Sequence, residues 1–94
     1  MNSLQDALYN WLTIKVVCDA RPEDTAAFET KEMFEGLLTE EHALGSLKVR
    51  KDGSMYYVDF VKDGSADIRR FPAELIEAML HQINLEPQKY RNFT

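Results

Sequence analysis

The tetrapeptide Lys-Asp-Gly-Ser occurs twice in the middle of the chain, at 51–54 and again at 62–65. Asp-Gly between alternating segments is among the strongest signals for a β-hairpin, because a tight hairpin turn needs positive φ angles. A two-residue loop at the first turn would place Val49 opposite Tyr56. Apolar residues alternate with polar ones around the turns: Leu47, Val49, Tyr56, Val58 and Phe60. The pattern predicts an antiparallel meander of three strands, at about 46–51, 54–61 and 65–70.

The second turn is predicted to be longer than the first. A two-residue loop there would place apolar Phe60 opposite charged Asp67. A three-residue loop, 62–64, with its glycine in a bulge places Phe60 opposite Ala66 instead. Because burial selects the register of a strand, we expect the three-residue loop, which also turns Ile68 toward the core.

The segment before the meander begins with a helix signal. Ser3 precedes an apolar residue and has an acidic residue three positions later, which is typical of a helix N-cap. Apolar residues then recur at helical spacing, which predicts a helix over about 4–19. Alternation and β-branched residues over 12–16 favour a strand there as the rival interpretation.

Two further helices complete the predicted fold. Proline suits the first turn of a helix. Pro22 therefore predicts a second helix to about residue 42, with Gly45 as its stop, and Pro72 predicts a last helix to about residue 85. We expect residues 87–94 to be an irregular tail. The chain is thus predicted to be one α+β domain over 1–94, in the order α-α-β-β-β-α, with helices covering one face of the sheet.

Charge and composition restrict the classes of function. The chain has 94 residues and a net charge of −5, which disfavours general binding to nucleic acid. Charge is uneven, however, with a balance of −6 over 19–45 (eight acidic, two basic) and +2 over 46–72 (six basic, four acidic). No apolar run approaches the roughly 20 residues of a membrane span, and no secretory signal is visible. With a single cysteine, Cys18, the chain is expected to be cytoplasmic and not to associate with membranes.

The outer face of the predicted sheet is a candidate interaction face. Cations beside an exposed aromatic ring can hold single-stranded nucleic acid, and the same face can bind a protein. A solvated surface with cross-strand ion pairs explains the pattern equally simply. The residues expected on this face are Lys48, Arg50, Met55, Tyr57, Asp59, Asp67 and Arg69, of which Lys48, Arg50, Tyr57 and Arg69 are the candidate binding residues.

Residues with reactive side chains do not form a recognisable site in the sequence. Neither copy of the repeated tetrapeptide has the alternating aspartates and final glutamate of a calcium loop. His42 and His81 lack ligand-type partners at metal-binding spacing. Lys15 and Cys18 fall on the apolar face of the first helix, where packing explains them without chemistry. We therefore expect no catalytic residue, no metal and no cofactor, although a pocket lined by Lys15 and Cys18 would favour an enzyme.

Several apolar residues have no place in the predicted core. Exposed apolar residues that gather on a small chain indicate a partner or a second copy. We therefore expect a small non-enzymatic protein that acts through protein–protein contacts and forms a homo-oligomer, with a nucleic-acid-binding module as the alternative. The candidate residues for self-association are Tyr9, Phe28, Met33 and Phe93.

Overall fold

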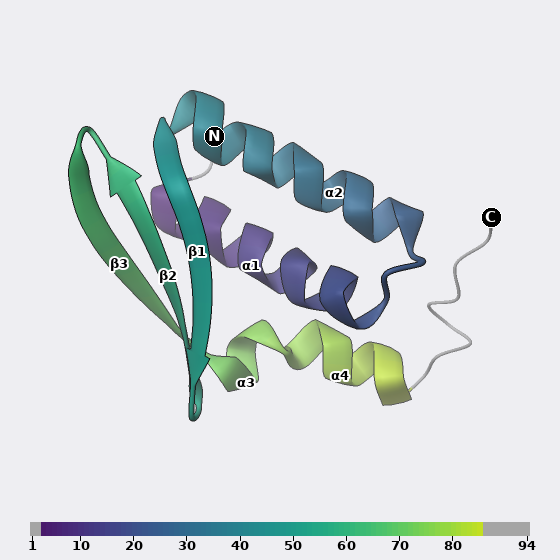
Figure 1. Ribbon diagram of the computed structural model, residues 1–94. Coiled ribbons are helices and arrows are strands. Elements are labelled where there is room, and N and C mark those ends of the chain that lie inside the picture. The colour runs from purple at the N-terminus through teal and green to yellow at the C-terminus, as the bar shows by residue number, and fades with distance from the viewer. Residues whose placement is uncertain (1–2, 86–94) are drawn as a thin grey trace.

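A computed structural model describes residues 3–85 of the chain as a sheet with helices packed on one side (Figure 1). The sheet has three antiparallel strands in the order β1-β2-β3. The predicted α+β class and element order are therefore confirmed, and the predicted tail at 87–94 lies outside the described residues. The elements are α1 (Leu4–Ala20), α2 (Thr25–Gly36), the π-helical turn η1 (Leu37–Glu41), β1 (Leu44–Asp52), β2 (Met55–Lys62), β3 (Ser65–Pro72), α3 (Ala73–Ile76) and α4 (Ala78–Leu85).

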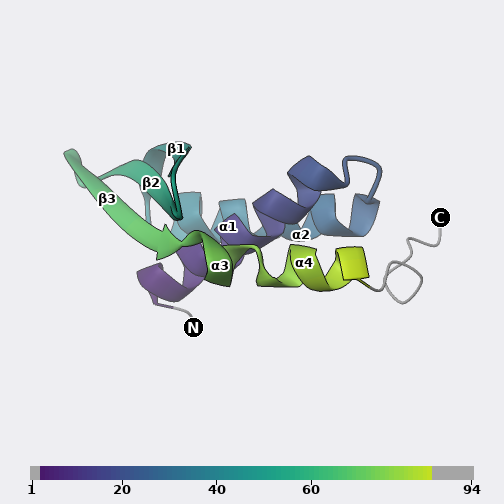
Figure 2. The same cartoon turned by 90° about the horizontal axis from the view of Figure 1, so that it is seen from below.

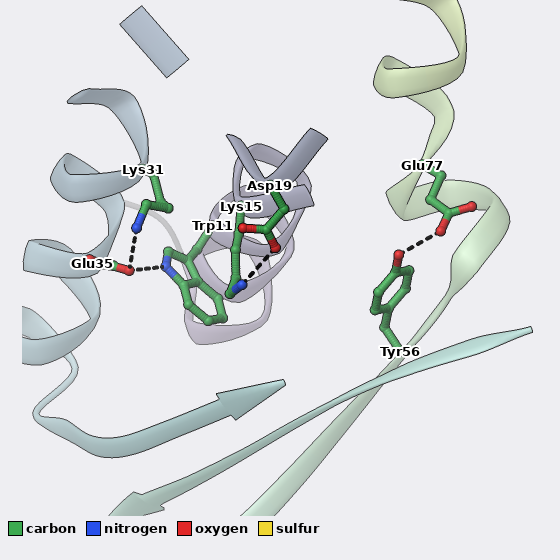
Figure 3. A network of polar contacts seen from close by, with 7 residues as sticks. All are labelled: Trp11, Lys15, Asp19, Lys31, Glu35, Tyr56 and Glu77. Atoms are coloured by element: carbon green, nitrogen blue, oxygen red, sulfur yellow. Dashed lines mark hydrogen bonds and ion pairs between the residues drawn. The ribbon is translucent and has the colours of Figure 1, made fainter. Parts of the chain in front are cut away.

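Helix α1 is continuous, so the rival prediction of a strand over 12–16 is wrong. The Ser3 hydroxyl accepts a hydrogen bond from the Asp6 amide at 3.1 Å and caps the helix, as the sequence predicts. At mid-helix, the indole N–H of Trp11 donates to a carboxylate oxygen of Glu35 in α2 at 3.1 Å (Figure 3). The bond fixes the two helices side by side. No helix within residues 3–85 is long and apolar enough to cross a membrane.

The second helix begins later than Pro22 predicts, whereas its helical run continues through η1 to Glu41, close to the predicted residue 42. Its N-cap is Asp24, whose carboxylate accepts from the Ala27 amide at 3.0 Å, whereas Pro22 lies in the turn before the cap. A helix needs such an acceptor because its first amides have no partner within the helix. At the other end, Ala43 adopts the left-handed conformation (φ 55°) that the sequence assigns to Gly45. Gly45 already pairs with β2, so its predicted role as helix stop is wrong.

The first hairpin turns one residue later than predicted. The loop consists of Gly53 and Ser54, of which only the glycine has a positive φ angle, and Val49 stands opposite Val58 rather than Tyr56. A shift of pairing partner by two residues leaves every side chain on its original face of the sheet. The faces predicted for β1 and β2 therefore hold although the register was wrong.

The second hairpin has the two-residue loop that the sequence analysis rejected. Asp63 (φ 53°) and Gly64 (φ 79°) both have positive φ angles, as a type I′ turn requires, and Phe60 pairs with Asp67. This one-residue change exchanges the two faces of β3. As a result Phe71 is buried at 4% exposure, whereas Ile68 is 50% exposed on the opposite face. Burial of the larger aromatic ring explains why the observed register is preferred.

The apolar interior consists of two clusters of buried side chains. The main cluster joins α1, the inner face of the sheet and α3, and includes Leu8, Trp11, Val58 and Phe60. The smaller cluster joins α1, α2 and α4 through Val17, Ala27 and Ile83. Because α1 contributes to both clusters, it connects the sheet end of the molecule to the end formed by helices alone, as the view from below shows (Figure 2).

The last predicted helix is divided in two at Glu77, which leaves the helical conformation (φ −90°, ψ 2°). Its carboxylate accepts hydrogen bonds from the Tyr56 hydroxyl at 2.5 Å (Figure 3) and from the Lys51 ammonium at 2.9 Å. These bonds hold the pKa of Glu77 below its usual value. Burial and the same bond raise the pKa of Tyr56 to about 12, so its hydroxyl remains a donor at neutral pH. The junction of α3 and α4 is thereby attached to the first hairpin.

We predict that Gly64→Ala lowers the free energy of unfolding by about 1 kcal/mol or more, because an L-residue is strained at its φ of +79°. Gly45→Ala is the matched control, since neither glycine has an atom within 4 Å of an added Cβ and Gly45 lacks a positive φ. Gly45→Ala should change stability by less than about 0.5 kcal/mol. Urea unfolding checks both values, and equal losses would contradict the turn assignment.

We predict that Glu77→Gln lowers the free energy of unfolding by about 1–2 kcal/mol at pH 7, because it weakens two hydrogen bonds to a charged acceptor. A carboxyl group whose pKa is lower in the folded state than in the unfolded state stabilises the fold at pH values above its unfolded-state pKa. This stabilisation is lost as the pH falls through the folded-state pKa.

The difference in stability between wild type and Glu77→Gln should therefore be constant near neutrality and shrink as the pH falls below the ordinary value of 4.5. Urea titrations from pH 7 to pH 3 measure it, with Glu74→Gln, an exposed acid in α3, as the control. A difference that is the same at every pH would contradict the role given to the carboxylate.

Candidate functional site on the open face of the sheet

The helices cover only one face of the sheet. Both views place all of them on the same side of the strands (Figures 1 and 2). The covered face carries the buried residues Tyr56, Val58, Phe60 and Phe71. We call the opposite face the open face. Its side chains come from the alternate positions of the same strands.

One row of the open face places a tyrosine between two arginines. Tyr57 of β2 pairs with Arg50 of β1 on one side and with Arg70 of β3 on the other. The Arg50 guanidinium carbon lies 4.9 Å from the centre of the Tyr57 ring, within the range of a cation–π contact. Lys48, the other cation predicted here, lies in the next row, opposite Asp59.

Asp59 neutralises part of the positive charge on the open face. Arg50 binds it through two bonds, Nε to Oδ2 at 2.8 Å and Nη2 to Oδ1 at 3.2 Å. The hydrogen bond from Arg50 lowers the pKa of Asp59 and in return raises the pKa of Arg50. The predicted ion pair between β1 and β2 is therefore present, with Arg50 as the partner, and this arginine is less available to an external anion.

The open face also contains an apolar groove of about 500 Å³ near the second turn. Its lining includes Val61 and Ala66, which face each other across β2 and β3, together with Ile68. The charged residues Lys48 and Asp59 also line it. The lining residues are Ser46, Lys48, Asp59, Phe60, Val61, Ala66, Asp67 and Ile68.

The predictions that Asp67 and Arg69 lie on the open face are wrong. Asp67 pairs with Phe60 and therefore shares the helix-covered face. Arg69 pairs with Val58, so it shares the helix-covered face, where its guanidinium lies 5.9 Å from the Phe60 ring centre. One of its nitrogens donates to Gln5 of α1 at 2.9 Å. Arg70 takes the predicted place, and Ile68 joins it. The Asp-Gly pair at the second turn was the signal that could have identified both residues, had it been assigned the two-residue loop.

The exposed edge of β3 has few free amides. Because the turn bond makes Lys62 and Ser65 a hydrogen-bonded pair, alternate residues from Ala66 onward point their amides away from β2. The Ile68 amide in this set donates to the Asp67 carboxylate at 2.7 Å. Pro72, in the same set, has no amide hydrogen. The face of the sheet is therefore better suited to contacts than this edge.

The described residues among those predicted for self-association, Tyr9, Phe28 and Met33, are spread over α1 and α2. Tyr9 of α1 places its ring 6.3 Å from that of Phe71. Phe28 and Met33 of α2 are both exposed, but five positions along a helix correspond to a rotation of roughly 140°. Phe93 lies outside the described residues. Self-association through these residues stays a prediction.

The residues considered for chemistry have ordinary contacts. Lys15 bonds to Asp19 at 2.9 Å on the surface of α1 (Figure 3). Cys18 lines a hollow with Arg21, Phe28 and other residues, but Lys15 is not part of it. Burial raises the pKa of the Cys18 thiol, which disfavours the reactive thiolate. Among residues 3–85 no three histidine, cysteine, aspartate or glutamate side chains could jointly hold a metal ion.

Comparisons with known proteins do not assign a function to the chain. No family model matches the chain, and neither a curated protein nor a solved structure is significantly similar to it.

Proposed function

We propose that this protein acts by binding another copy of itself through the open face of its sheet. The observation that carries the proposal is the groove lined by Val61, Ala66 and Ile68, among other residues, on the side that no described helix covers. An exposed apolar surface next to charged residues is typical of a protein contact. The activity proposed is therefore binding rather than catalysis, in the cytoplasm that the sequence predicts.

We choose a second copy as the partner because the face carries charges of both signs beside its apolar residues. In a two-fold dimer the same patch must serve both partners, so it needs both signs of charge. The open face has cationic Lys48 and Arg70 in addition to the ion pair of Arg50 with Asp59, and Lys48 and Asp59 line the apolar groove. Two copies packed face to face would bury Ile68 against its equivalent and bring opposite charges together at the rim.

The size of the sheet indicates a weak complex. Three strands of nine, eight and eight residues offer a small area for contact, so we expect an interface at the low end of buried areas. We therefore expect a dimer with a Kd on the order of 10–100 µM, which exchanges readily with the monomer.

We predict that sedimentation velocity detects this dimer and that Ile68→Asp weakens it by at least about tenfold, because a charge replaces the centre of the contact. Ile68 is already 50% exposed, so the fold should tolerate the change. Met33→Asp is the matched control: it places the same charge at a 58% exposed apolar residue of α2 and should leave the dimer unchanged.

Two outcomes would contradict the proposal. A wild-type protein that stays monomeric at several hundred micromolar would exclude self-association of the proposed strength. A dimer that Met33→Asp disrupts and Ile68→Asp does not would move the contact from the sheet to the helices.

Binding of nucleic acid is the second candidate, favoured by the row in which Arg50 and Arg70 flank Tyr57. An aromatic ring between two cations could stack a base and meet phosphate. The ion pair of Arg50 with Asp59 and the net charge of −5 oppose it.

We expect no binding of fluorescent single-stranded DNA or RNA to a protein concentration of about 100 µM at physiological salt. Fluorescence anisotropy measures this. If salt-sensitive binding appears, Arg70→Glu should abolish it and Arg69→Glu should not, since the two neighbouring arginines lie on opposite faces. That result would establish the second candidate in place of the first.

A further inference from the structure

Helix α4 belongs to only one of the two apolar clusters. The main cluster includes Ala73 and Ile76 of α3 but no described residue of α4. Helix α4 contributes Ile83 and partly buried Leu80 to the smaller cluster, against Val17 and Ala27. The last helix is therefore attached to α1 and α2 by few side chains, and none of its described contacts supports the sheet.

The packing of α4 on its neighbours is incomplete. A groove of about 210 Å³ lies between α4 and α2, with Ile14 and Val17 of α1 in its lining. Ile83 and Met79 of α4 line the same groove, and Met79 remains about half exposed. A helix that leaves such a gap forgoes part of the dispersion energy that close packing would supply.

The connection between α3 and α4 has the properties of a hinge. The chain leaves the helical conformation at Glu77 alone, so rotation there moves α4 without disturbing α3. The Glu77 side chain is held by Tyr56 and Lys51 of the first hairpin. This anchor keeps the pivot in place when the helix beyond it moves.

We propose that α4 is a strap that opens as a unit about Glu77 while the sheet, α1 and α3 remain folded. Opening uncovers an apolar strip of Ile14 and Val17 on α1 and Ala27 on α2. This strip lies among the helices, away from the open face of the sheet, so the strap is independent of the proposed dimer. It gives the molecule a second apolar surface that is present only in the open form.

Native-state hydrogen exchange at increasing urea concentrations tests the strap in the wild-type protein. For amides that exchange by local opening, the opening free energy depends only weakly on the urea concentration. For amides that exchange only by global unfolding, it falls with the same slope as the free energy of unfolding. The amides of His81 to Leu85 in α4 should exchange at least about tenfold faster than those of β2, with the weaker dependence. Equal rates and equal slopes in α4 and β2 would overturn the proposal.

A pair of matched variants provides the second test. Ile83→Asp should undock α4, removing the protection of its amides, while β2 amides stay protected and unfolding stays cooperative. Ile76→Asp, the same change seven residues earlier in the main cluster, should remove protection from both elements. If Ile83→Asp unfolds the sheet, or if α4 stays protected in that variant, the strap is excluded.

Discussion

The turn at Asp63 and Gly64 decides on which face of the sheet every side chain of β3 lies. With two central residues in the left-handed region, the turn fixes the pairing of Phe60 with Asp67. Phe71 thereby enters the core, and Ile68 turns outward. The buried interior and the exposed groove are thus two results of one local backbone constraint, because alternation along a strand transmits the register over its whole length.

Helix α1 transmits this arrangement to the rest of the molecule. Leu8 and Trp11 pack against the sheet, and Val17 further along the same helix packs against α2 and α4. The main cluster thus buries one part of the helix against the sheet, and the smaller cluster buries another part against helices. Helix α1 connects the well-packed sheet end of the molecule to the less well-packed end formed by helices. The two ends can therefore differ in local stability.

Sequence reasoning succeeded where the signal was local and failed where distant residues decided. The cap at Ser3 and the two Asp-Gly turns identified α1 and the meander. The predicted register of β3 is wrong because the residues beside the turn favour the three-residue loop, whereas the burial of Phe71 at the far end of the strand favours the observed one. The error replaced Arg70 by Arg69 in the candidate site. The break at Glu77 had no sequence signal, because glutamate favours helices and its anchors lie in the first hairpin.

A sheet this small has two edges, and each is a template on which further chains could assemble into fibrils. The bond from the Ile68 amide to the Asp67 carboxylate occupies a donor that an incoming strand would need. Proline at the end of β3 removes another donor. Asp67 is thus unfavourable opposite Phe60 but useful at the margin of the sheet, because its carboxylate occupies a backbone donor beside the exposed Ile68 that another strand would otherwise pair with.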